Sequence, residues 1–417
     1  MEKQLLILSS TFPVDSNDVF LEKELPFLKV QFRNILIVPT DVEHEAFSSY
    51  TEDGVQFEIR TFPCTFSAYC RSVFSKQFLH VVREIILLNK QKRLTLFKLK
   101  VLLKAHCKAV QIAQFTNKLL NSSLPTVGYS YWGDTSAVAL GYLKRIKPQI
   151  ETVARFHGWD LYEERALEAY LPLRTATWRS LDFLVPISQH GVDYLKAKDG
   201  AGSPHNFRLA YLGVSKAKKF PEYTVDSCVQ LISVINTSEV KRLDRLISVV
   251  NYLNTRINLK WTLVGIPHEN LELLCSRMHV RPIGNCYCPG VLSNEEVIRL
   301  YEEKSFDALL SLSDSEGVPF SMMEAMVHET PVLSTDVGGV SELVQQDRGL
   351  LFSVHDTDDS IATSIYNWLQ RPLEDRISER KQARIFVEKH FLDETNFGNF
   401  ASWLTSLKSS FPDEPAS

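Results

Sequence analysis

Two glutamates eight residues apart, Glu316 and Glu324, stand in the part of the sequence whose residue types are best suited to chemistry. Between them lies a Gly-Val-Pro turn at residues 317–319, in which glycine lets a ligand approach the backbone and proline stiffens the turn. A helix is expected to begin near Ser321, and the free N–H groups of such a helix start bind anions. Any one of these residues alone would suit an ordinary turn or surface helix. Together they predict carboxylates that accept hydrogen bonds from sugar or ribose hydroxyls beside a bound pyrophosphate.

Short apolar runs that alternate with helical patterns predict the elements that must hold these residues. Strands are expected at Leu5–Leu8, Ile35–Val38, Thr126–Ser130, Thr152–Phe156 and Phe183–Ile187, and again at Val229–Ile235, Leu259–Val264, Ala308–Leu312, Pro331–Ser334 and Leu350–Phe352. Helices are expected from about Phe20, and at Leu243–Leu253, Ser321–Val327 and Asn294–Tyr301, the last capped by Asn294. Such alternation is typical of parallel sheets covered by helices on both faces. Ligands bind at the carboxyl ends of the strands in such sheets.

The composition excludes several classes of protein. A chain of 417 residues suggests two domains, and its formal net charge of -4 argues against a nucleic-acid binder. Seven cysteines without a CxxC pair indicate free thiols in a reducing compartment. Cys286 and Cys288 lie near His279, but the spacing is wrong for a zinc site, so no metal is expected. No leader is apparent and no run approaches the ~18 apolar residues of a membrane span, so a cytoplasmic location is expected.

The segment from Ser313 to Met326 and the following Pro331–Glu342 resemble the donor-site motif of the family-four retaining glycosyltransferases. The shared features are the two spaced glutamates, the Glu-Gly-x-Pro loop, the Glu-Ala-Met helix start and the Gly-Gly-x-x-Glu ending. In the first half, Thr11–Pro13, Tyr129–Trp132 and Arg155–Arg165 look like the branch of that family that builds bacterial surface polysaccharides. The resemblance covers most of the chain.

This resemblance implies the GT-B architecture, in which two doubly wound, Rossmann-like α/β domains face each other across a cleft. The expected organisation is an acceptor-side domain at 1–205, a donor-side domain at 206–385 and a helical segment at 386–417 that crosses back to the first domain. Lys198–His205, rich in Gly, Ser and Pro, is the expected linker. The implied activity is metal-independent transfer of a sugar, with retention and without a cofactor, from a nucleotide-diphosphate sugar to a glycan or lipid-linked acceptor. The implied pathways are exopolysaccharide, capsule or O-antigen synthesis.

The resemblance also implies roles for individual residues. Glu316 is expected to contact the transferred sugar, Glu324 to hold the ribose, and His157 to face the sugar from the first domain. Lys241 and Arg242 are expected to meet the diphosphate, whose negative charge grows as the glycosidic bond breaks. Lys241 as a solvated cation and His157 as a core histidine are the plainer alternatives. Backbone groups that meet the sugar and phosphates are expected from Gly317, Val318 and Ser321.

Two positions depart from the wider family. Asn236 stands where many members carry an arginine on the diphosphate, which leaves Arg242 to supply the second cation. The loop at 13–18 contains no glycine, although many members have a Gly-Gly pair there that approaches the donor. The rival hypotheses are another enzyme on the same architecture, such as an epimerase or phosphorylase, and a catalytically inactive glycosyltransferase-like binding partner. The Glu-Gly-x-Pro loop and the Lys241-Arg242 pair argue against the first, and the presence of Glu316, Glu324, Lys241 and His157 argues against the second.

One segment carries a strong excess of positive charge. Residues 71–120 contain eleven Lys or Arg and a single acid, Glu84, among many apolar side chains. A basic amphipathic segment of this kind suits an anionic membrane surface, which would place the protein peripherally at the inner face of the cell membrane. The alternative is a pair of solvated helices whose apolar face belongs to the core.

Overall fold

The computed structural model describes residues 2–14, 19–42, 47–121, 123–199, 206–223, 228–277 and 285–407. The chain forms two compact units: unit 1 comprises Met1–Tyr211 and Phe397–Ser417, and unit 2 comprises Leu212–Asn396. The units therefore divide after Tyr211 and Asn396, compared with the predicted 205 and 385. Residues 200–205 of the predicted linker, residues 15–18 of the glycine-free loop, and His279 lie outside the described residues.

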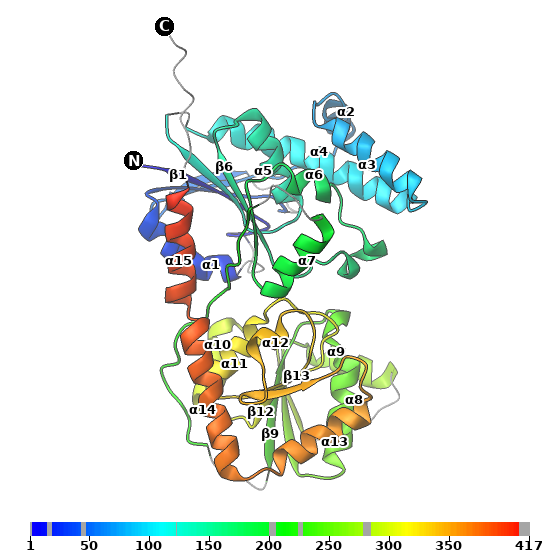
Figure 1. Ribbon diagram of the computed structural model, residues 1–417, viewed down its shortest axis with the longest axis vertical. Coiled ribbons are helices and arrows are strands. Elements are labelled where there is room, and N and C mark those ends of the chain that lie inside the picture. Colours follow the sequence, from blue (N-terminus) through cyan, green and yellow to red (C-terminus); the bar gives the residue numbers. More distant parts are fainter. Residues whose placement is uncertain are drawn as a thin grey trace. The chain divides into compact units, whose positions relative to one another are not determined.

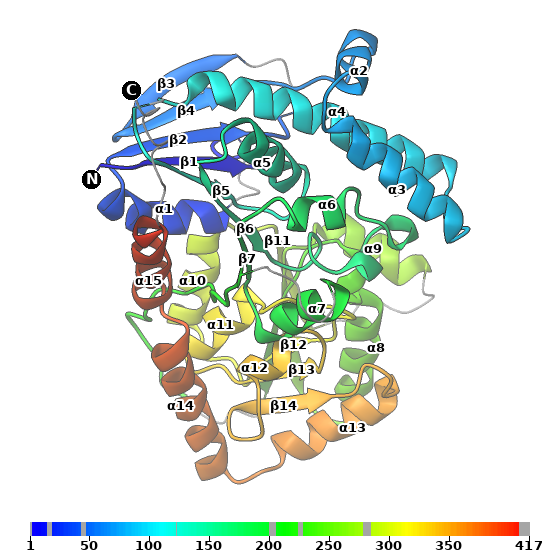
Figure 2. The same cartoon turned by 45° about the horizontal axis from the view of Figure 1, so that its top comes forward.

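Unit 1 is built on an eight-stranded sheet with the order β3-β4-β2-β1-β5-β6-β7-β8 (Figures 1 and 2). Its strands are β1 (Gln4–Ser9), β2 (Asn34–Pro39), β3 (Ser48–Glu52), β4 (Val55–Ile59), β5 (Thr126–Ser130), β6 (Glu151–Phe156), β7 (Phe183–Pro186) and β8 (Asn206–Phe207). All neighbours pair in parallel except β3, which runs antiparallel to β4 at one edge. No strand was predicted at β3, because its residues, Ser-Ser-Tyr-Thr-Glu, are mostly polar and exposed and form no apolar run.

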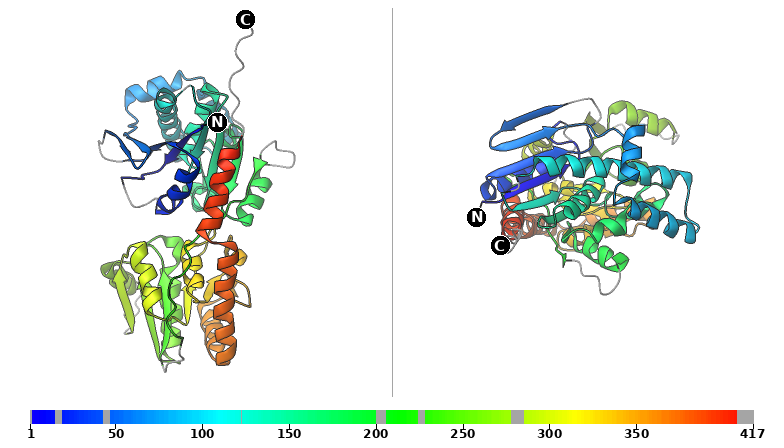
Figure 3. Two further views of the ribbon diagram at one scale, coloured as in Figure 1. Left: turned by 90° about the vertical axis from the view of Figure 1, so that its left-hand side faces the viewer. Right: turned by 90° about the horizontal axis from the view of Figure 1, so that it is seen from above.

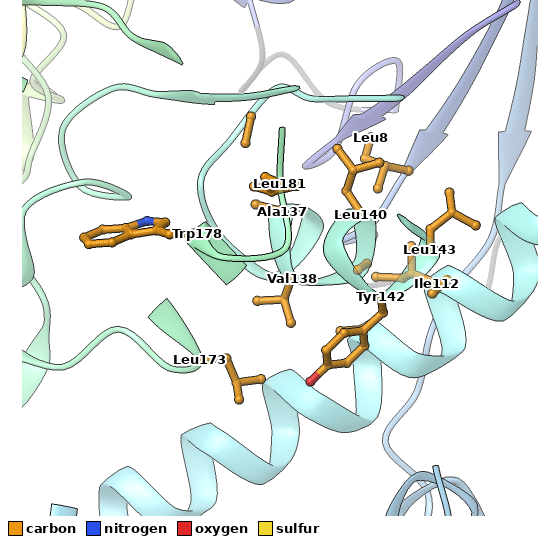
Figure 4. Packing of buried hydrophobic residues seen from close by; sticks show 14 of the residues in the cluster. Leu8, Ile112, Ala137, Val138, Leu140, Tyr142, Leu143, Leu173, Trp178 and Leu181 are labelled. Atoms are coloured by element: carbon orange, nitrogen blue, oxygen red, sulfur yellow. The ribbon is translucent and has the colours of Figure 1, made fainter. Parts of the chain in front are cut away.

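Helices cover both faces of this sheet. Alternate residues of β1 enter two different cores: Leu6 and Leu8 pack in one, and Leu5 and Ile7 in the other. The first core is completed mainly by α4 (Leu96–Leu119) and α5 (Thr135–Ile146), as the packing around Leu8 and Leu140 in Figure 4 shows. The second is completed by α1 (Val19–Gln31) and α15 (Asp393–Ser406). Every residue of β1 is buried, and successive side chains enter opposite cores, because the sheet lies between two helical layers.

The end of the chain returns to unit 1 through α15 (Figure 3). Its residues Phe400 and Leu404 are buried in the same core as Leu5 and Ile7 of β1. At the start of this return, the rings of Phe27 and Phe397 lie 5.8 Å apart. The fold of unit 1 thus depends on residues from both ends of the sequence.

A fully buried ion pair joins three elements of unit 1. Arg155 Nη1 of β6 donates to Glu24 Oε2 of α1 at 2.6 Å, and the guanidinium carbon of Arg155 lies 4.1 Å from the ring centroid of Phe400. Burial raises the pKa of Glu24 in spite of this partner. Arg155 therefore has a structural role, which the sequence could not separate from a role in the site.

Arg155→Leu is expected to lower the free energy of unfolding by about 3–5 kcal/mol, because it leaves the Glu24 carboxyl buried without its cation. The measurement is urea unfolding followed by circular dichroism. The double variant Glu24→Leu/Arg155→Leu should be clearly more stable than the single variant, since no charge is then left unpaired. Equal stability of the two variants would contradict the assigned role of the pair.

Unit 2 contains a six-stranded, all-parallel sheet with the order β11-β10-β9-β12-β13-β14 (Figure 1). Its strands are β9 (Val229–Val234), β10 (Leu259–Val264), β11 (Cys286–Gly290), β12 (Ala308–Ser311), β13 (Val332–Thr335) and β14 (Gly349–Phe352). Its helices are α8 (Leu243–Asn254), α9 (His268–Arg277), α10 (Asn294–Glu303), α11 (Phe320–Val327), α12 (Val340–Leu343), α13 (Asp358–Leu369) and α14 (Leu373–His390). Each strand predicted for the second half is present, with its ends shifted by at most a residue or two.

The basic segment 71–120 folds into the end of α2 (Phe66–Val73), α3 (Phe78–Lys90) and α4 of unit 1. The middle of α4 belongs to the core, where Leu102 and Ala109 are fully buried. In contrast, α2, α3 and the turn after α2 expose large apolar side chains to solvent, among them Phe66, Phe74, Leu79 and Ile86. Among the described residues, no helix is both long and apolar enough to span a bilayer.

Candidate active site

Three loops at the carboxyl ends of neighbouring strands of unit 2 form the candidate site. They follow β9, β12 and β13, which lie side by side in the sheet. The loop after β12 is tied to both neighbours: Asp314 N–H donates to Val240 O at 2.8 Å, and Gly339 N–H donates to Gly317 O at 2.9 Å. Thr335 Oγ1 also donates to Ser313 O at 2.5 Å. The backbone around Glu316 is therefore fixed from both sides before any ligand binds.

Lys241 and Glu316 meet in this site. Lys241 Nζ donates to Glu316 Oε1 at 2.7 Å, and the Glu316 side chain is only 8% exposed. Lys241 ends a 3-10 turn after β9, whereas Glu316 lies in the loop after β12, so the parallel sheet brings the two together across 75 positions of sequence. Because Lys241 pairs with a buried carboxylate, the structure excludes the alternative of a merely solvated cation.

Arg242 is held by two carboxylates. Its guanidinium donates to Asp244 Oδ2 at 2.8 Å and to Asp314 Oδ1 at 3.0 Å, and the hydrogen bonds to Asp244 raise the pKa of Arg242 further above its ordinary value. Its backbone is left-handed, with φ 49°, at the point where the 3-10 turn gives way to α8. A hollow of about 780 Å³ beside it is also lined by Asn236, Asn270 and Asp314. A hollow of this size accommodates a nucleotide.

Glu324 lies on α11 and is buried, with a side chain that accepts a hydrogen bond from Asn294 Nδ2 at 2.5 Å. The sequence predicted Asn294 as the cap of α10, and this prediction is wrong. Ser293 caps the helix instead, in a capping box with Glu296. Ser293 takes this role because its hydroxyl accepts from the backbone of Glu296 while the Glu296 carboxylate accepts from Ser293. Asn294 is thereby free to position the carboxylate of Glu324.

The remaining predicted residues of this loop lie where the helix begins. Pro319 precedes the first residue of α11, and its carbonyl accepts the backbone N–H of Met322 at 3.2 Å. Val318 is buried and packs its side chain away from solvent, whereas Gly317 and Ser321 are partly exposed. Gly317 and Ser321 are thus open to a ligand at the start of the helix, which is the arrangement that binds phosphate.

Gly338 supports the loop that carries Glu316. Its φ is +58°, and a Cβ atom at this position would lie 1.9 Å from Glu316 O. Only glycine fits here, because any side chain would push the Glu316 backbone out of place. The sequence shows Gly-Gly at 338–339 within the resembling segment, but the contact with Glu316 could not be deduced from it.

A family model describes the same part of the chain. Residues 216–384 match the family of glycosyl transferases group 1. The chain carries a group 1 glycosyltransferase domain. This domain occupies nearly all of unit 2 and contains Lys241, Arg242, Glu316 and Glu324.

Three bacterial proteins whose names place them in polysaccharide biosynthesis are similar to parts of this chain. The putative colanic acid biosynthesis glycosyltransferase WcaL of Escherichia coli K12 is 27% identical over 283 residues, 65% of this chain and 68% of that protein. The amylovoran biosynthesis glycosyltransferase AmsK of Erwinia amylovora is 26% identical over 277 residues, 61% of this chain and 67% of that protein. The O-antigen biosynthesis glycosyltransferase WbnH of Escherichia coli is 35% identical over 96 residues, 23% of this chain and 26% of that protein.

Solved structures resemble the whole chain. Sucrose-phosphate synthase from Thermosynechococcus elongatus superposes with a TM-score of 0.72 at 13% identity, covering 97% of this chain and 99% of that one. Anabaena Alr3699/HepE in complex with UDP and glucose gives a TM-score of 0.66 at 13% identity, covering 97% and 100%. At this identity the likeness shows the fold alone, and the predicted GT-B fold with two α/β units is confirmed.

His157 lies in unit 1, directly after β6. Its Nδ1 is 3.5 Å from Asp160 Oδ2, and its ring lies 4.2 Å from that of Trp132 between centroids. Asp160 is fully buried and accepts the backbone N–H groups of His157 and Gly158 at 2.8 and 3.0 Å. Burial opposes the charged form of Asp160, but its hydrogen bonds with His157 and the backbone outweigh this effect and lower its pKa. Asp160 therefore positions His157, a role that the sequence did not distinguish from packing.

Asn294→Leu is expected to weaken donor binding to the group 1 domain by about tenfold, because Glu324 loses the hydrogen bond that orients its carboxylate. The measurement is isothermal titration with the free nucleoside diphosphate. Ser293→Ala should destabilise α10 by about 1 kcal/mol while leaving the affinity nearly unchanged, and it serves as the matched control. A larger loss of affinity in Ser293→Ala than in Asn294→Leu would contradict the role given to Asn294.

Proposed function

We propose that this protein is a retaining glycosyltransferase that moves a sugar from a nucleotide-diphosphate sugar to a glycan or lipid-linked acceptor in bacterial surface-polysaccharide synthesis. The observation that carries the proposal is the Lys241–Glu316 pair, fixed in the group 1 domain at the carboxyl ends of β9 and β12. The names of WcaL, AmsK and WbnH support the pathway. The complex of HepE with UDP and glucose supports a nucleotide-sugar donor.

The proposed roles follow the geometry of unit 2. Glu316 accepts hydrogen bonds from the transferred sugar, and Glu324, oriented by Asn294, holds the ribose hydroxyls. Lys241, with Arg242 beside it, meets the diphosphate together with backbone groups of Gly317, Val318 and Ser321. These groups stabilise the negative charge of the departing nucleoside diphosphate, so the proposal includes no metal and no cofactor. His157 completes the proposed catalytic residues from unit 1.

The experiment that tests this function measures release of free nucleoside diphosphate from a panel of UDP-, GDP- and ADP-sugars. Slow hydrolysis of one donor is expected in the presence of EDTA. The donor that is hydrolysed identifies the base and the sugar that the protein uses. Adding membrane lipid extract that contains glycan acceptors should accelerate the release. A folded protein that releases no diphosphate from any donor, with or without acceptor, would favour an inactive binding partner instead.

We also propose that the protein works in the cytoplasm, peripherally bound to the inner face of the membrane through residues 71–120. The support is a surface on α2, α3 and the turn between them where exposed apolar residues lie among cations. Phe66 is 85% exposed and Phe74 is 88% exposed, close to Arg71 and Lys76 in the sequence. Apolar side chains in a basic surface enter the interface of an anionic bilayer.

Phe66→Ser/Phe74→Ser is expected to weaken binding to vesicles of 30% anionic lipid by about tenfold or more, because two aromatic rings no longer enter the interface. Co-sedimentation with the vesicles measures the effect. Val30→Ser/Phe47→Ser removes two exposed apolar residues of unit 1 that lie outside α2, α3 and the turn between them, and this variant should bind as the wild type does. Equal losses in both variants would argue against a specific membrane surface on α2 and α3.

A further inference from the structure

A second hollow, of about 380 Å³, lies within unit 1 and belongs to none of the residues discussed for donor turnover. It is bordered by α3, the end of α5, α6 (Arg174–Trp178) and the segment 163–171. Its lining is rich in guanidinium groups, which come from Arg83, Arg93, Arg145, Arg174 and Arg179. Two carboxylates, Glu84 and Glu163, also line it.

The two carboxylates have partners of their own. Glu84 accepts hydrogen bonds from Tyr170 Oη at 2.5 Å and from the backbone N–H of Leu173 at 3.0 Å, and burial raises its pKa. Glu163 pairs with Lys198 at 3.3 Å. Neither carboxylate forms an ion pair with an arginine of the hollow within the part of the chain that the structure describes. Glu163 acts on Arg174 through its charge, but two carboxylates are fewer than the five arginines of the lining, so the lining keeps an excess of positive charge.

Three of the arginines are held by no acceptor among the described residues. Arg93 donates to Ala169 O and Arg174 donates to Asp160 O, but no described carboxylate pairs with Arg83, Arg145 or Arg179. Arg174 is almost entirely buried, yet its Nε also lacks an acceptor among the described residues. Guanidinium groups that converge without carboxylates form a site for an anion with several oxygens, such as a phosphate.

The pKa of His80 depends on this charge because His80 lines the same hollow as the arginines. Burial, together with the positive charges of Arg145, Arg83 and His106, lowers the pKa of His80 to about 4. Its ring stacks on Tyr142 with centroids 6.5 Å apart. At neutral pH the imidazole is uncharged, so it adds no repulsion to the cluster. A bound anion would offset the cations and raise this pKa.

Helix α3, which borders the hollow, also exposes apolar side chains to solvent. Leu87 lines the hollow and is half exposed, and Leu79, Val82 and Ile86 on α3 are exposed as well. Leu79, Val82 and Ile86 recur at intervals of three and four, so they form one stripe along the helix, and Leu87 lies beside this stripe, one turn after Arg83. The hollow is thus cationic, and its border is apolar.

We propose that this arginine-lined hollow binds the phosphate or diphosphate group of a lipid-linked acceptor, while the lipid chain runs along the exposed apolar stripe of α3. The inference rests on the proposed function, whose acceptor it specifies. A lipid headgroup and a free phosphate would present the same phosphate group to the arginines. Only the lipid would also contact the apolar stripe of α3. The amphipathic border favours the lipid.

The first arm of the test uses inorganic pyrophosphate and NMR of the His80 ring in the full-length protein. Saturating pyrophosphate is expected to raise the pKa of His80 by about one unit or more. The variant Arg83→Gln/Arg145→Gln/Arg179→Gln should lose at least about tenfold in pyrophosphate affinity. The control Lys76→Gln/Lys90→Gln/Lys100→Gln removes the same number of positive charges from unit 1 but outside the hollow, and it should bind as the wild type does.

The second arm compares neutral vesicles that contain polyprenyl phosphate with vesicles that contain the uncharged polyprenol. Binding to the phosphate vesicles should be at least about tenfold tighter, and only the arginine variant should lose the difference. An unchanged His80 pKa with pyrophosphate, or equal losses in the arginine and lysine variants, would overturn the site. If the hollow binds pyrophosphate but the protein shows no preference for vesicles with polyprenyl phosphate, the hollow binds free phosphates and the proposal of a lipid-linked ligand is wrong. Donor hydrolysis in the arginine variant should stay at the wild-type rate, so a failure of this site is distinct from a failure of the proposed activity.

Discussion

Lys241→Ala is expected to lower turnover of the nucleotide-sugar donor by about a hundredfold or more. Two effects add in this variant. The departing diphosphate loses a charge-assisted hydrogen bond, and the carboxylate of Glu316, only 8% exposed, loses the cation that lies 2.7 Å away. An uncompensated carboxylate beside the diphosphate would repel it, so the loss should exceed that of one hydrogen bond.

A double-mutant cycle on nucleoside diphosphate release separates these effects. Glu316→Gln alone should reduce turnover strongly, because the neutral amide keeps only one accepting oxygen and loses the charge that strengthens hydrogen bonds from the sugar hydroxyls. If Lys241 acts partly by neutralising Glu316, Lys241→Ala/Glu316→Gln should be much less impaired than the product of the single effects predicts. Lys241→Arg keeps the charge and should retain more activity than Lys241→Ala. Full activity in Lys241→Ala would refute the proposed site.

Gly338→Ala is expected to reduce turnover by about a hundredfold or more while the fold remains intact. The new methyl group would lie 1.9 Å from Glu316 O, and a backbone atom cannot yield without moving the loop. Displacement of a catalytic loop by about 1 Å is enough for a loss of this size. Turnover at saturating donor concentration measures the loss of activity, and thermal unfolding checks that the fold remains intact.

Gly54→Ala is the matched control for this prediction. Gly54 also has a left-handed backbone, with φ +80°, but an added Cβ would meet no atom within 4 Å. Both variants carry the strain of alanine at positive φ, about 1 kcal/mol, and only Gly338→Ala adds the clash. Equal activity of the two variants would show that Gly338 does not position Glu316.

The strands and helices that carry the site follow from local sequence. Runs such as Ala308–Ser311 form buried parallel strands because both faces of the sheet are covered, so every residue of the run is buried. The edge strand β3 and the strand β11, with its sequence Cys-Tyr-Cys-Pro-Gly, lack such a run and gave no local signal. Capping of α10 was misassigned because Ser293 and Asn294 are both good caps, and only the Glu296 carboxylate decides between them.

The sequence by itself determined the residue types of the proposed donor site, because Glu316, Gly317, Pro319 and Glu324 lie close together along the chain in one strand-loop-helix unit. The tertiary structure decided the partners that give those residues their chemistry. The pairing of Lys241 with Glu316, of Asn294 with Glu324 and of Gly338 with the Glu316 carbonyl each joins different loops of the sheet. Such contacts depend on strand order, which no local pattern of residues encodes, and the same holds for the arginines that converge in unit 1.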